Sequence, residues 1–322
     1  MSPQFFLGLD GGQTSTVALI GNEEGVVLGY GEAGPSNHVR APGGQKKLRR
    51  AVVGAVNAAW SNSPFPGRRR PAFESAFFGM TGGPEDKAAI LSEVIRARRL
   101  EITHDAVTAL MGATEGRPGI IVIAGTGSIS FGMNAGGETA RAGGWGYVFG
   151  DQGSGFDIAR QALVAALRQE EGWGPATALG ERIIDFSEFS GAANINDALH
   201  RWYTAEFSRD RVASFSRVVD QAARAGDRVA RAILRNAALE LSQLVARVRR
   251  RIFRPKEEVL VSYIGGVFKS RIVLDRFRKL VRAQAPNRVL PPVLGPAAGA
   301  LLAAYRAAGR TDLKLKNLPP EL

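Results

Sequence analysis

The chain has 322 residues, of which 45% are hydrophobic and 22% charged, a composition typical of a globular protein long enough for two domains. Because it contains no cysteine, disulfides, thiolate zinc sites, thiol nucleophiles and cysteine-held iron–sulfur clusters are excluded. The formal net charge is +12, but the basic residues are dispersed and no nucleic-acid-binding motif accompanies them. We therefore expect a cytoplasmic protein that binds neither nucleic acid nor membrane, with a basic surface that attracts anionic ligands.

The first predicted element is a short buried strand over 5–9 that ends in Asp10-Gly11-Gly12-Gln13-Thr14-Ser15. Strands are expected again over 16–20 and 26–31, so the chain opens as an antiparallel β-meander. Two glycines after an aspartate let the backbone approach a phosphate closely, and Thr14 adds a hydroxyl donor. An ordinary hairpin tip gives the same local pattern.

The next segment alternates strands and helices. A glycine- and proline-rich loop over 32–45 holds Asn37, and an amphipathic helix is expected over 46–60. A strand over 76–80, a helix over 85–99 and a strand over 100–103 follow. The last of these strands delivers Asp105, and a helix begins directly after it.

The central stretch combines a carboxylate with a glycine loop. After the helix that follows Asp105, an apolar strand over 120–124 ends in Gly125-Thr126-Gly127-Ser128. Phosphoryl transfer requires at least a backbone that binds phosphate and a carboxylate that can act as a base. A βαβ unit with a plain glycine turn and a helix-capping aspartate would look the same.

The order of elements then repeats. Strands over 129–134 and 139–141 form a hairpin after the second glycine loop, which indicates a duplicated architecture without duplicated sequence. The following stretch, 143–156, contains six glycines together with Trp145 and Asp151. Such a loop suits a polar ligand pocket, although a plain glycine-rich connection is the alternative.

The remaining third is mainly helical. A polar, irregular stretch is expected over 170–194, and the tail over 309–322 is expected to fray. A strand over 258–264 ends in Gly265-Gly266. Helices are expected over 158–169, 195–207, 212–224, 227–250, 270–283 and 296–308.

These motifs carry a resemblance. The segments HDAVTAL, IAGTGS, GGWGYVFGDQGSG and GGVFKS, in this order, resemble the N-acetylglucosamine kinase and BadF/BadG-type ATPase family of the actin/hexokinase superfamily. The resemblance implies an α/β fold of two ribonuclease-H-like (actin-like ATPase) domains, with a duplicated β-meander and an interdomain cleft. The domains would cover 1–116 and 117–322, the second with a helical insertion. The last helix, about 296–308, is a candidate to pack back on the first domain.

The resemblance also implies residue roles. Asp10 would orient Mg²⁺ through water, and Asp105 would bind the sugar and take the proton of its attacking hydroxyl. The ATP phosphates would be held by Gly11, Gly12, Thr14, Gly125, Thr126 and Gly127, adenosine would border Gly265, Gly266 and Ser270, and sugar hydroxyls would bind Asn37, Gly144, Trp145 and Asp151.

The implied activity is an ATP-dependent amino-sugar kinase that phosphorylates the 6-hydroxyl of N-acetylglucosamine, expected as a homodimer. Glucosamine, glucose and N-acetylmuramic acid are alternative substrates. An activating ATPase for dehydratases or reductases would need a cysteine-held cluster, and a sugar sensor would need a DNA-binding segment; neither fits this sequence. The sequence departs from the family pattern at two positions. His104 stands where Asn is usual, which is expected to change only the support around Asp105. Gln152 stands where Glu is usual, which removes a charge beside the sugar pocket and leaves the choice of sugar open.

Overall fold

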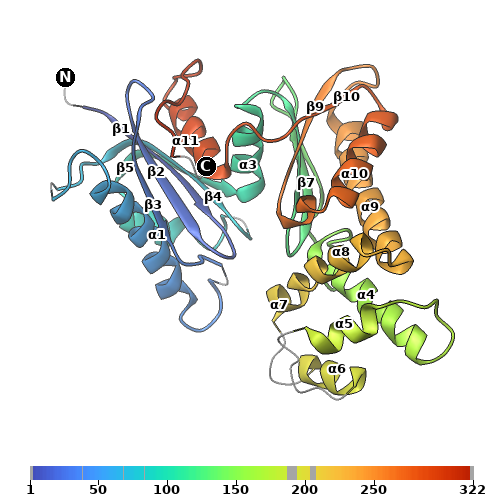
Figure 1. Cartoon of the computed structure of the whole chain (residues 1–322). Coiled ribbons are helices and arrows are strands. Elements are labelled where there is room, and N and C mark those ends of the chain that lie inside the picture. The colour runs from blue at the N-terminus through green and yellow to red at the C-terminus, as the bar shows by residue number, and fades with distance from the viewer. Residues whose placement is uncertain are drawn as a thin grey trace. The chain divides into compact units, whose positions relative to one another are not determined.

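The computed structural model describes residues 3–37, 39–67, 69–82, 84–186, 194–203 and 208–319, with the backbone alone for 201–203. The chain divides into two compact units (Figure 1). The first contains Met1–Pro118 and Pro291–Leu322, and the second contains Gly119–Leu290. The chain therefore leaves its first unit and returns to it, so the last helix is grouped with the N-terminal part rather than with 117–290.

The first unit is a five-stranded mixed sheet with helices. The strands follow the order β3-β2-β1-β4-β5, with antiparallel pairing in the β1–β2–β3 meander and parallel pairing of β1 with β4 and of β4 with β5. Its elements are β1 Phe5–Gly11, β2 Thr16–Asn22, β3 Val27–Ala33, α1 Gly44–Ser61, β4 Phe73–Met80, α2 Ala88–Val94, β5 Ala97–His104, α3 Asp105–Thr114 and α11 Pro296–Ala307.

Strand β1 is buried on both faces, which explains its continuous apolar sequence. Because successive side chains of a strand point to opposite faces, Leu7 and Leu9 join one cluster with residues of α1, while Phe6 joins another with residues of α11. The ring of Phe6 packs against Tyr305 of α11, with 4.3 Å between centroids. The sheet is thus covered by α1 on one face and by α11 on the other.

Helices α3 and α11 pack very closely. A Cβ added to Gly299 of α11 would lie 2.0 Å from the carbonyl oxygen of Thr108 and 2.3 Å from the amide nitrogen of Gly112, both on α3. A Cβ on Gly8 of β1 would lie 2.2 Å from the amide nitrogen of Leu301. Glycine is therefore required where these backbones meet. This packing fixes α3, whose first residue is Asp105.

The second unit repeats the sheet topology. Its strand order is β10-β9-β6-β7-β8, with an antiparallel β6–β7–β8 meander and parallel pairing of β6 with β9 and of β9 with β10. Its elements are β6 Gly119–Ala124, β7 Ser128–Met133, β8 Thr139–Gly143, α4 Gly155–Glu170, α5 Leu179–Asp185, α6 Ile195–Tyr203, α7 Arg209–Ser214, α8 Ser216–Arg224, α9 Arg228–Ile252, β9 Val259–Ile264, the 3₁₀ turn η2 Gly266–Lys269, α10 Arg271–Gln284 and β10 Asn287–Val289.

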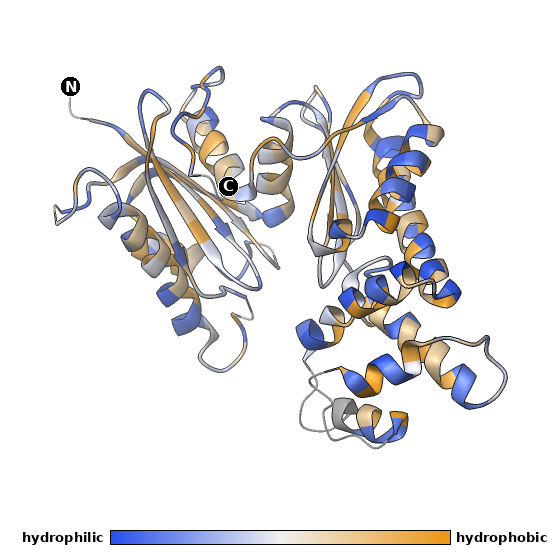
Figure 2. Cartoon of the chain, viewed as in Figure 1, coloured by the Kyte–Doolittle hydropathy of each residue, from blue (hydrophilic) through white to orange (hydrophobic). Residues whose placement is uncertain are grey.

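The core of the second unit lies between its sheet and α9. The stripe of Ile233, Ala237, Leu241, Leu244 and Val248 is buried in one cluster with residues of β6 and β9. Figure 2 shows hydrophobic stretches on the strands of both sheets, whereas the visible side of α10 is largely hydrophilic. The buried residues of α9 recur at helical spacing, as expected for an amphipathic helix that packs on a sheet.

The fold class expected from the sequence is confirmed, with two α/β units of the same sheet topology. Several element predictions are wrong. The helix expected over 85–99 ends at Val94, because the chain continues into β5, which pairs in parallel with β4. The helix expected over 212–224 is two helices, α7 and α8, and the irregular stretch over 170–194 contains α5. The expected helix segment 204–207 lies outside the described residues.

The C-terminal tail is packed rather than frayed. The amide of Val27 donates to the carbonyl oxygen of Lys316 at 2.9 Å, and the amide of Lys316 donates to Gly25 at 2.9 Å. Leu313, Leu315 and Leu318 lie against the cluster that contains Phe6. The tail therefore adds to the meander edge of the first unit.

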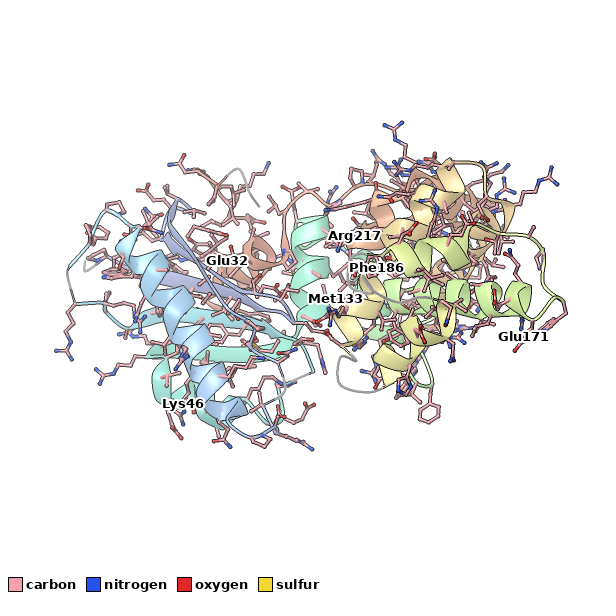
Figure 3. The ribbon with its side chains drawn as sticks, turned by 60° about the horizontal axis from the view of Figure 1, so that its bottom comes forward. Glu32, Lys46, Met133, Glu171, Phe186 and Arg217 are labelled. Carbon is pink, nitrogen blue, oxygen red and sulfur yellow. The ribbon has the colours of Figure 1, made fainter. Side chains whose placement is uncertain are left out.

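The basic charge is carried on exposed positions of both units. Lys46 of α1 and Arg217 of α8, labelled in Figure 3, are both exposed. In the described ranges, no helix is both long and apolar enough to cross a membrane.

Candidate functional site

The carboxyl ends of three neighbouring strands bring two aspartates together in the first unit. Asp10 near the end of β1 pairs with Gly79 of β4, and Met80 of β4 pairs with His104 of β5. Asp105 follows His104 directly as the first residue of α3. Ligands of open α/β sheets bind outside the carboxyl ends of the strands, so this edge is a candidate ligand-binding and catalytic site.

The two carboxylates influence each other. Burial, with the neighbouring Asp105 carboxylate, raises the pKa of Asp10 to about 7, although the Thr108 side chain opposes the shift. Burial also raises the pKa of Asp105. Hydrogen bonds from the Ala106 amide and the Thr81 side chain, together with the charges of His104 and Lys87, act in the opposite direction. A carboxylate pair with displaced pKa values is typical of a catalytic site.

Asp10 has an unused acceptor. Its Oδ1 atom is buried without a hydrogen-bond partner, which is costly unless a ligand supplies the missing interaction. No cluster of three or more metal-ligating side chains occurs among the described residues. A single oxygen donor beside a glycine-rich loop nevertheless fits Mg²⁺, which retains several waters and takes only one or two carboxylates from the protein.

The first glycine loop is a tight hairpin tip held by its own backbone. The amide of Gly12 donates to the carbonyl oxygen of Ser15 at 2.9 Å, and Thr81 donates to Gly11 at 2.9 Å. A Cβ on Gly11 would lie 2.7 Å from the hydroxyl of Ser36. Thr14 is exposed at the tip. Gly11 is thus fixed by packing, while Thr14 remains accessible to a ligand.

Two lysines of the first unit make polar contacts with Asn37 and Asp86. The Nζ of Lys47 donates to Oδ1 of Asn37 at 2.7 Å, which orients the Asn37 amide. Lys87 is buried and lies 2.9 Å from the Asp86 carboxylate. Sequence analysis did not single out Lys87, because a lysine before a helix is usually solvated.

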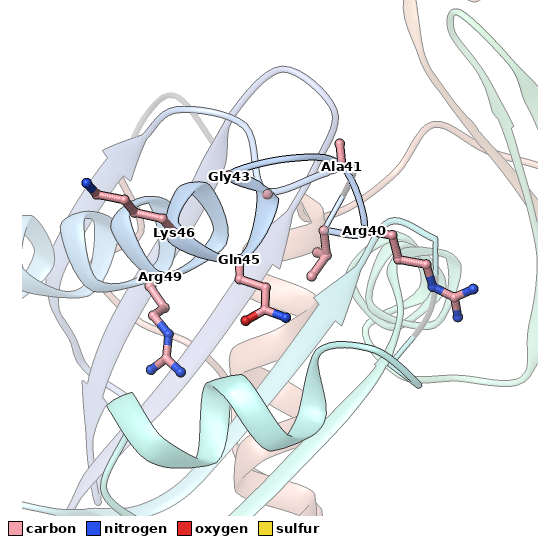
Figure 4. A pocket seen from close by; sticks show the side chains of 8 residues that line it. Arg40, Ala41, Gly43, Gln45, Lys46 and Arg49 are labelled. Carbon is pink, nitrogen blue, oxygen red and sulfur yellow. The ribbon is translucent and has the colours of Figure 1, made fainter.

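A separate open cavity of about 550 Å³ lies at the start of α1 (Figure 4). Gln45, Lys46 and Arg49 line it, together with Arg40 from the preceding loop. The predicted site residues are not among its lining. Arg40 and Arg49 each pair with a carboxylate, Asp86 and Glu93.

In the second unit, the Gly125-Thr126-Gly127 loop connects β6 to β7 and contacts the start of α4. The amide of Gly155 donates to the carbonyl oxygen of Gly125 at 2.8 Å. The Thr126 hydroxyl donates to Oδ1 of Asp210 at 2.8 Å. A Cβ on Gly265 would lie 2.3 Å from the carbonyl oxygen of Ala124, so the two glycine turns pack against each other.

Asp151 is the most constrained of the predicted site residues. It is 3% exposed and adopts φ 60°, a left-handed conformation that is unusual for a residue with a side chain. Its Oδ2 accepts from Nη2 of Arg209 at 2.6 Å. A Cβ on Gly127 would lie 2.7 Å from the same oxygen. Burial raises the pKa of Asp151, while the charge of Arg209 lowers it.

The loop before Asp151 exposes aromatic surface. Trp145 is 70% exposed, and the Arg141 guanidinium lies 4.9 Å from the centre of its ring. Gly144 has φ 72°, so a side chain there would be strained. An exposed indole stiffened by a stacked arginine is suited to contact the face of a sugar.

Ser270 is engaged within the protein. Its hydroxyl accepts from the Val273 amide as the N-cap of α10 and donates to the Asp220 carboxylate. Gly266 has open space around it. Of the adenosine residues expected from the resemblance, Gly266 leaves room for a ligand and Ser270 has a structural role.

The structure thus forms two groups of the predicted residues. Asp10 and Asp105 come together in the first unit, and Gly127 and Asp151 in the second. Arg209, the partner of Asp151, was missed by sequence analysis because it is separated by 58 positions along the chain. No local pattern identifies a contact of that kind.

Comparisons with known proteins agree with this arrangement. The chain is 32% identical over 291 residues, 88% of its length and 92% of the relative, to an N-acetylmuramic acid/N-acetylglucosamine kinase of Clostridium acetobutylicum. It is 27% identical over 319 residues, 95% and 99% of the two chains, to an N-acetyl-D-glucosamine kinase of Dictyostelium discoideum. A solved structure of a putative N-acetylglucosamine kinase from Chromobacterium violaceum matches with a TM-score of 0.78 at 26% identity, covering 94% and 99%. A family match spans residues 7–304, and the chain belongs to the BadF/BadG/BcrA/BcrD ATPase family.

Proposed function

We propose that this protein is an ATP-dependent amino-sugar kinase that phosphorylates the 6-hydroxyl of N-acetylglucosamine. The observation that carries the proposal is the aspartate pair, in which a buried, unpartnered Asp10 oxygen stands beside Asp105 at the carboxyl ends of β1, β4 and β5. Near-full-length similarity to proteins named as amino-sugar kinases supports the choice of acceptor. Membership of the ATPase family supplies ATP as the donor.

Asp105 is the proposed general base. It takes the proton of the acceptor hydroxyl as that oxygen attacks the γ-phosphorus, and the leaving ADP oxygen departs on the opposite side. The Thr81 side chain and the Ala106 amide hold the Asp105 carboxylate in place. Asp10 would hold Mg²⁺, which supplies charge neutralisation for the ATP phosphates when bound.

The glycine loops are the proposed phosphate contacts. Gly11, Gly12 and Thr14 serve in the first unit, and Gly125, Thr126 and Gly127 in the second. The exposed Thr14 hydroxyl supports the first assignment. If Thr126 contacts a phosphate, its hydroxyl must give up the hydrogen bond to Asp210. The negatively charged carboxylate would otherwise repel the phosphate. Gly265 and Gly266 are the proposed neighbours of adenosine, while the hydroxyl of Ser270 caps α10.

Asn37, Gly144, Trp145 and Asp151 are the proposed contacts of the sugar. Asn37 is held by Lys47, and Asp151 by Arg209, so both polar groups are oriented before a ligand arrives. Preorganised donors and acceptors bind at a lower entropic cost. His104 is the exposed residue before α3, and Gln152 is exposed beside Asp151, with its backbone carbonyl oxygen accepting from the Ser128 hydroxyl.

N-acetylmuramic acid is the second candidate substrate, supported by the name of the Clostridium acetobutylicum relative. Glucosamine and glucose are further alternatives. Activation of a dehydratase or reductase through a cysteine-held cluster is disfavoured, because this chain has no cysteine. A non-catalytic sugar sensor is disfavoured by the retained Asp105.

A coupled assay of ADP release tests the proposal, with N-acetylglucosamine, N-acetylmuramic acid, glucosamine and glucose as acceptors. We expect the highest kcat/KM with N-acetylglucosamine and slow release of ADP without sugar. ADP release that no sugar accelerates would contradict a kinase. The homodimer expected from the sequence stays a prediction, which light scattering would check.

A further inference from the structure

Helix α7 begins with two residues that contact the predicted ligand loops of the second unit. Arg209, its first residue, donates to Oδ2 of Asp151 at 2.6 Å, and Asp210 accepts from the Thr126 hydroxyl at 2.8 Å. The Arg209 guanidinium also lies 5.4 Å from the centre of the Tyr147 ring. Arg209 therefore lies against both the loop of 144–150 and Asp151.

The Asp151 side chain needs a counter-ion. It is 4% exposed, whereas the Arg209 side chain is 26% exposed, so the carboxylate is enclosed and the guanidinium reaches toward solvent. A buried carboxylate without a partner becomes protonated or destabilises the fold. The other charged group that acts on Asp151 is Asp157, which repels it and pairs with Arg160 at 3.0 Å. Arg209 is thus the cation that compensates Asp151.

The surroundings of Asp151 leave acceptor capacity for a ligand. The hydrogen bond from Arg209 occupies one position on a carboxylate that offers about four. The backbone amides of Ser128 and Gly146 act on the same carboxylate and lower its pKa. Gly146 belongs to the loop that holds Trp145.

We propose that Arg209 is the positioning residue of the sugar site: it holds the Asp151 carboxylate charged and fixed, so that the carboxylate accepts a sugar hydroxyl. The inference rests on the proposed function, in which Asp151 contacts the sugar. Arg209 acts through Asp151 and leaves the transferred phosphoryl group to other residues. Its loss should therefore change sugar affinity more than turnover.

The test compares Arg209→Met, which removes the charge, with Arg209→Lys, which keeps it. Arg217→Met is the matched control, because Arg217 is an exposed arginine on the neighbouring helix α8 (Figure 3). We expect Arg209→Met to raise the KM for N-acetylglucosamine roughly 10-fold or more, as the loss of a charge-assisted contact should. The KM for ATP and kcat should change much less, and the control should resemble the wild type.

The pH profile separates a charge effect from a packing effect. Removing Arg209 removes the charge that lowers the pKa of Asp151, so the carboxyl of the variant stays protonated to a higher pH than that of the wild type. In Arg209→Met the sugar KM should therefore fall as the pH rises from about 6 to about 9, while the wild type and Arg209→Lys vary less. If Arg209→Met keeps the wild-type KM and profile, the proposal is wrong. It is also wrong if Arg209→Lys shows the same pH dependence as Arg209→Met.

A measurement without sugar distinguishes this inference from the kinase proposal. Ionised Asp151 without its counter-ion destabilises the folded protein, and the penalty grows as the pH rises through the pKa range of Asp151. The Tm difference between wild type and Arg209→Met should therefore be larger at about pH 8 than at about pH 5. Arg217→Met should show no such trend. An inactive wild type that still shows this trend would contradict the kinase, whereas an active wild type with equal Tm differences at both pH values would contradict the role of Arg209.

Discussion

Asp105 is the residue on which the proposed chemistry depends. In Asp105→Asn the amide cannot accept the proton of the acceptor hydroxyl, so we expect kcat to fall roughly 10²-fold or more. Calorimetry should still detect sugar binding, because the amide keeps the size of the carboxylate and retains one acceptor oxygen. Near-normal turnover in this variant would remove Asp105 from the role of base.

Gly127 belongs to the proposed phosphate-binding loop and lies against Asp151, the proposed sugar ligand. A side chain here would meet Nη2 of Arg209 at 2.5 Å and Oδ2 of Asp151 at 2.7 Å. Gly127→Ala should therefore raise the KM for the sugar as well as the KM for ATP. In Gly125→Ala the added methyl meets nothing within 4 Å, so its effect on the sugar KM should be clearly smaller. Equal sugar KM values in the two variants would contradict this.

Single-residue features were predictable where the chemistry lies in a contiguous motif. Asp10 with its glycines, and Asp105 before a helix, are read directly from the sequence. The pairs Arg209–Asp151 and Thr126–Asp210 are separated by 58 and 84 positions and carry no sequence signature. They exist because α7 packs beside the start of α4, which only the fold reveals.

At the scale of elements, the contact of α3 with α11 positions Asp105. The Cβ of Gly299→Ala would lie 2.0 Å from the α3 backbone, so we expect a loss of unfolding free energy of about 1–3 kcal/mol and a lower kcat. Gly54→Ala is the control, because Gly54 is exposed on α1 and its added methyl lies 3.4 Å from Ala33. That change should be neutral or stabilising by up to about 1 kcal/mol. Urea unfolding measures both, and equal stability of the two variants would contradict the packing argument.

The C-terminal tail should contribute to stability. Truncation after Gly309 removes three packed leucines, the Lys316 pairing with the meander and the bond from Arg310 to the Glu23 carbonyl oxygen. We expect the free energy of unfolding to fall by about 2 kcal/mol or more. Lys314→Ala, at an exposed position of the same tail, should have little effect. An unchanged Tm after truncation would restore the expectation of a frayed tail.

Two element predictions failed for physical reasons. The helix expected over 85–99 took in the start of β5, where Arg98 and Arg99 suggest a helix surface, while 100–103 was correctly expected as a strand. These charged residues fit a strand because β5 is the edge of its sheet, where charged side chains reach solvent. The tail was expected to fray because it is the end of the chain. Its leucines alternate with polar residues, and that alternation is the pattern of a segment packed on one side.

At the scale of the whole molecule, the duplicated sheet was predictable. Each half opens with an antiparallel meander whose glycine-rich tip follows a buried strand, and the structure confirms the same strand order in both sheets. The grouping of α11 with the first unit follows from tertiary packing, and the sequence offered this helix only as a candidate to pack there.

Phosphorus NMR of a reaction with ATP, Mg²⁺ and N-acetylglucosamine tests most directly whether the protein transfers a phosphoryl group to the 6-hydroxyl of an amino sugar. We expect a new phosphomonoester signal coupled to the two protons on carbon 6, with roughly 10²-fold slower growth in Asp105→Asn. Release of inorganic phosphate alone, or a phosphomonoester on another carbon, would contradict this transfer.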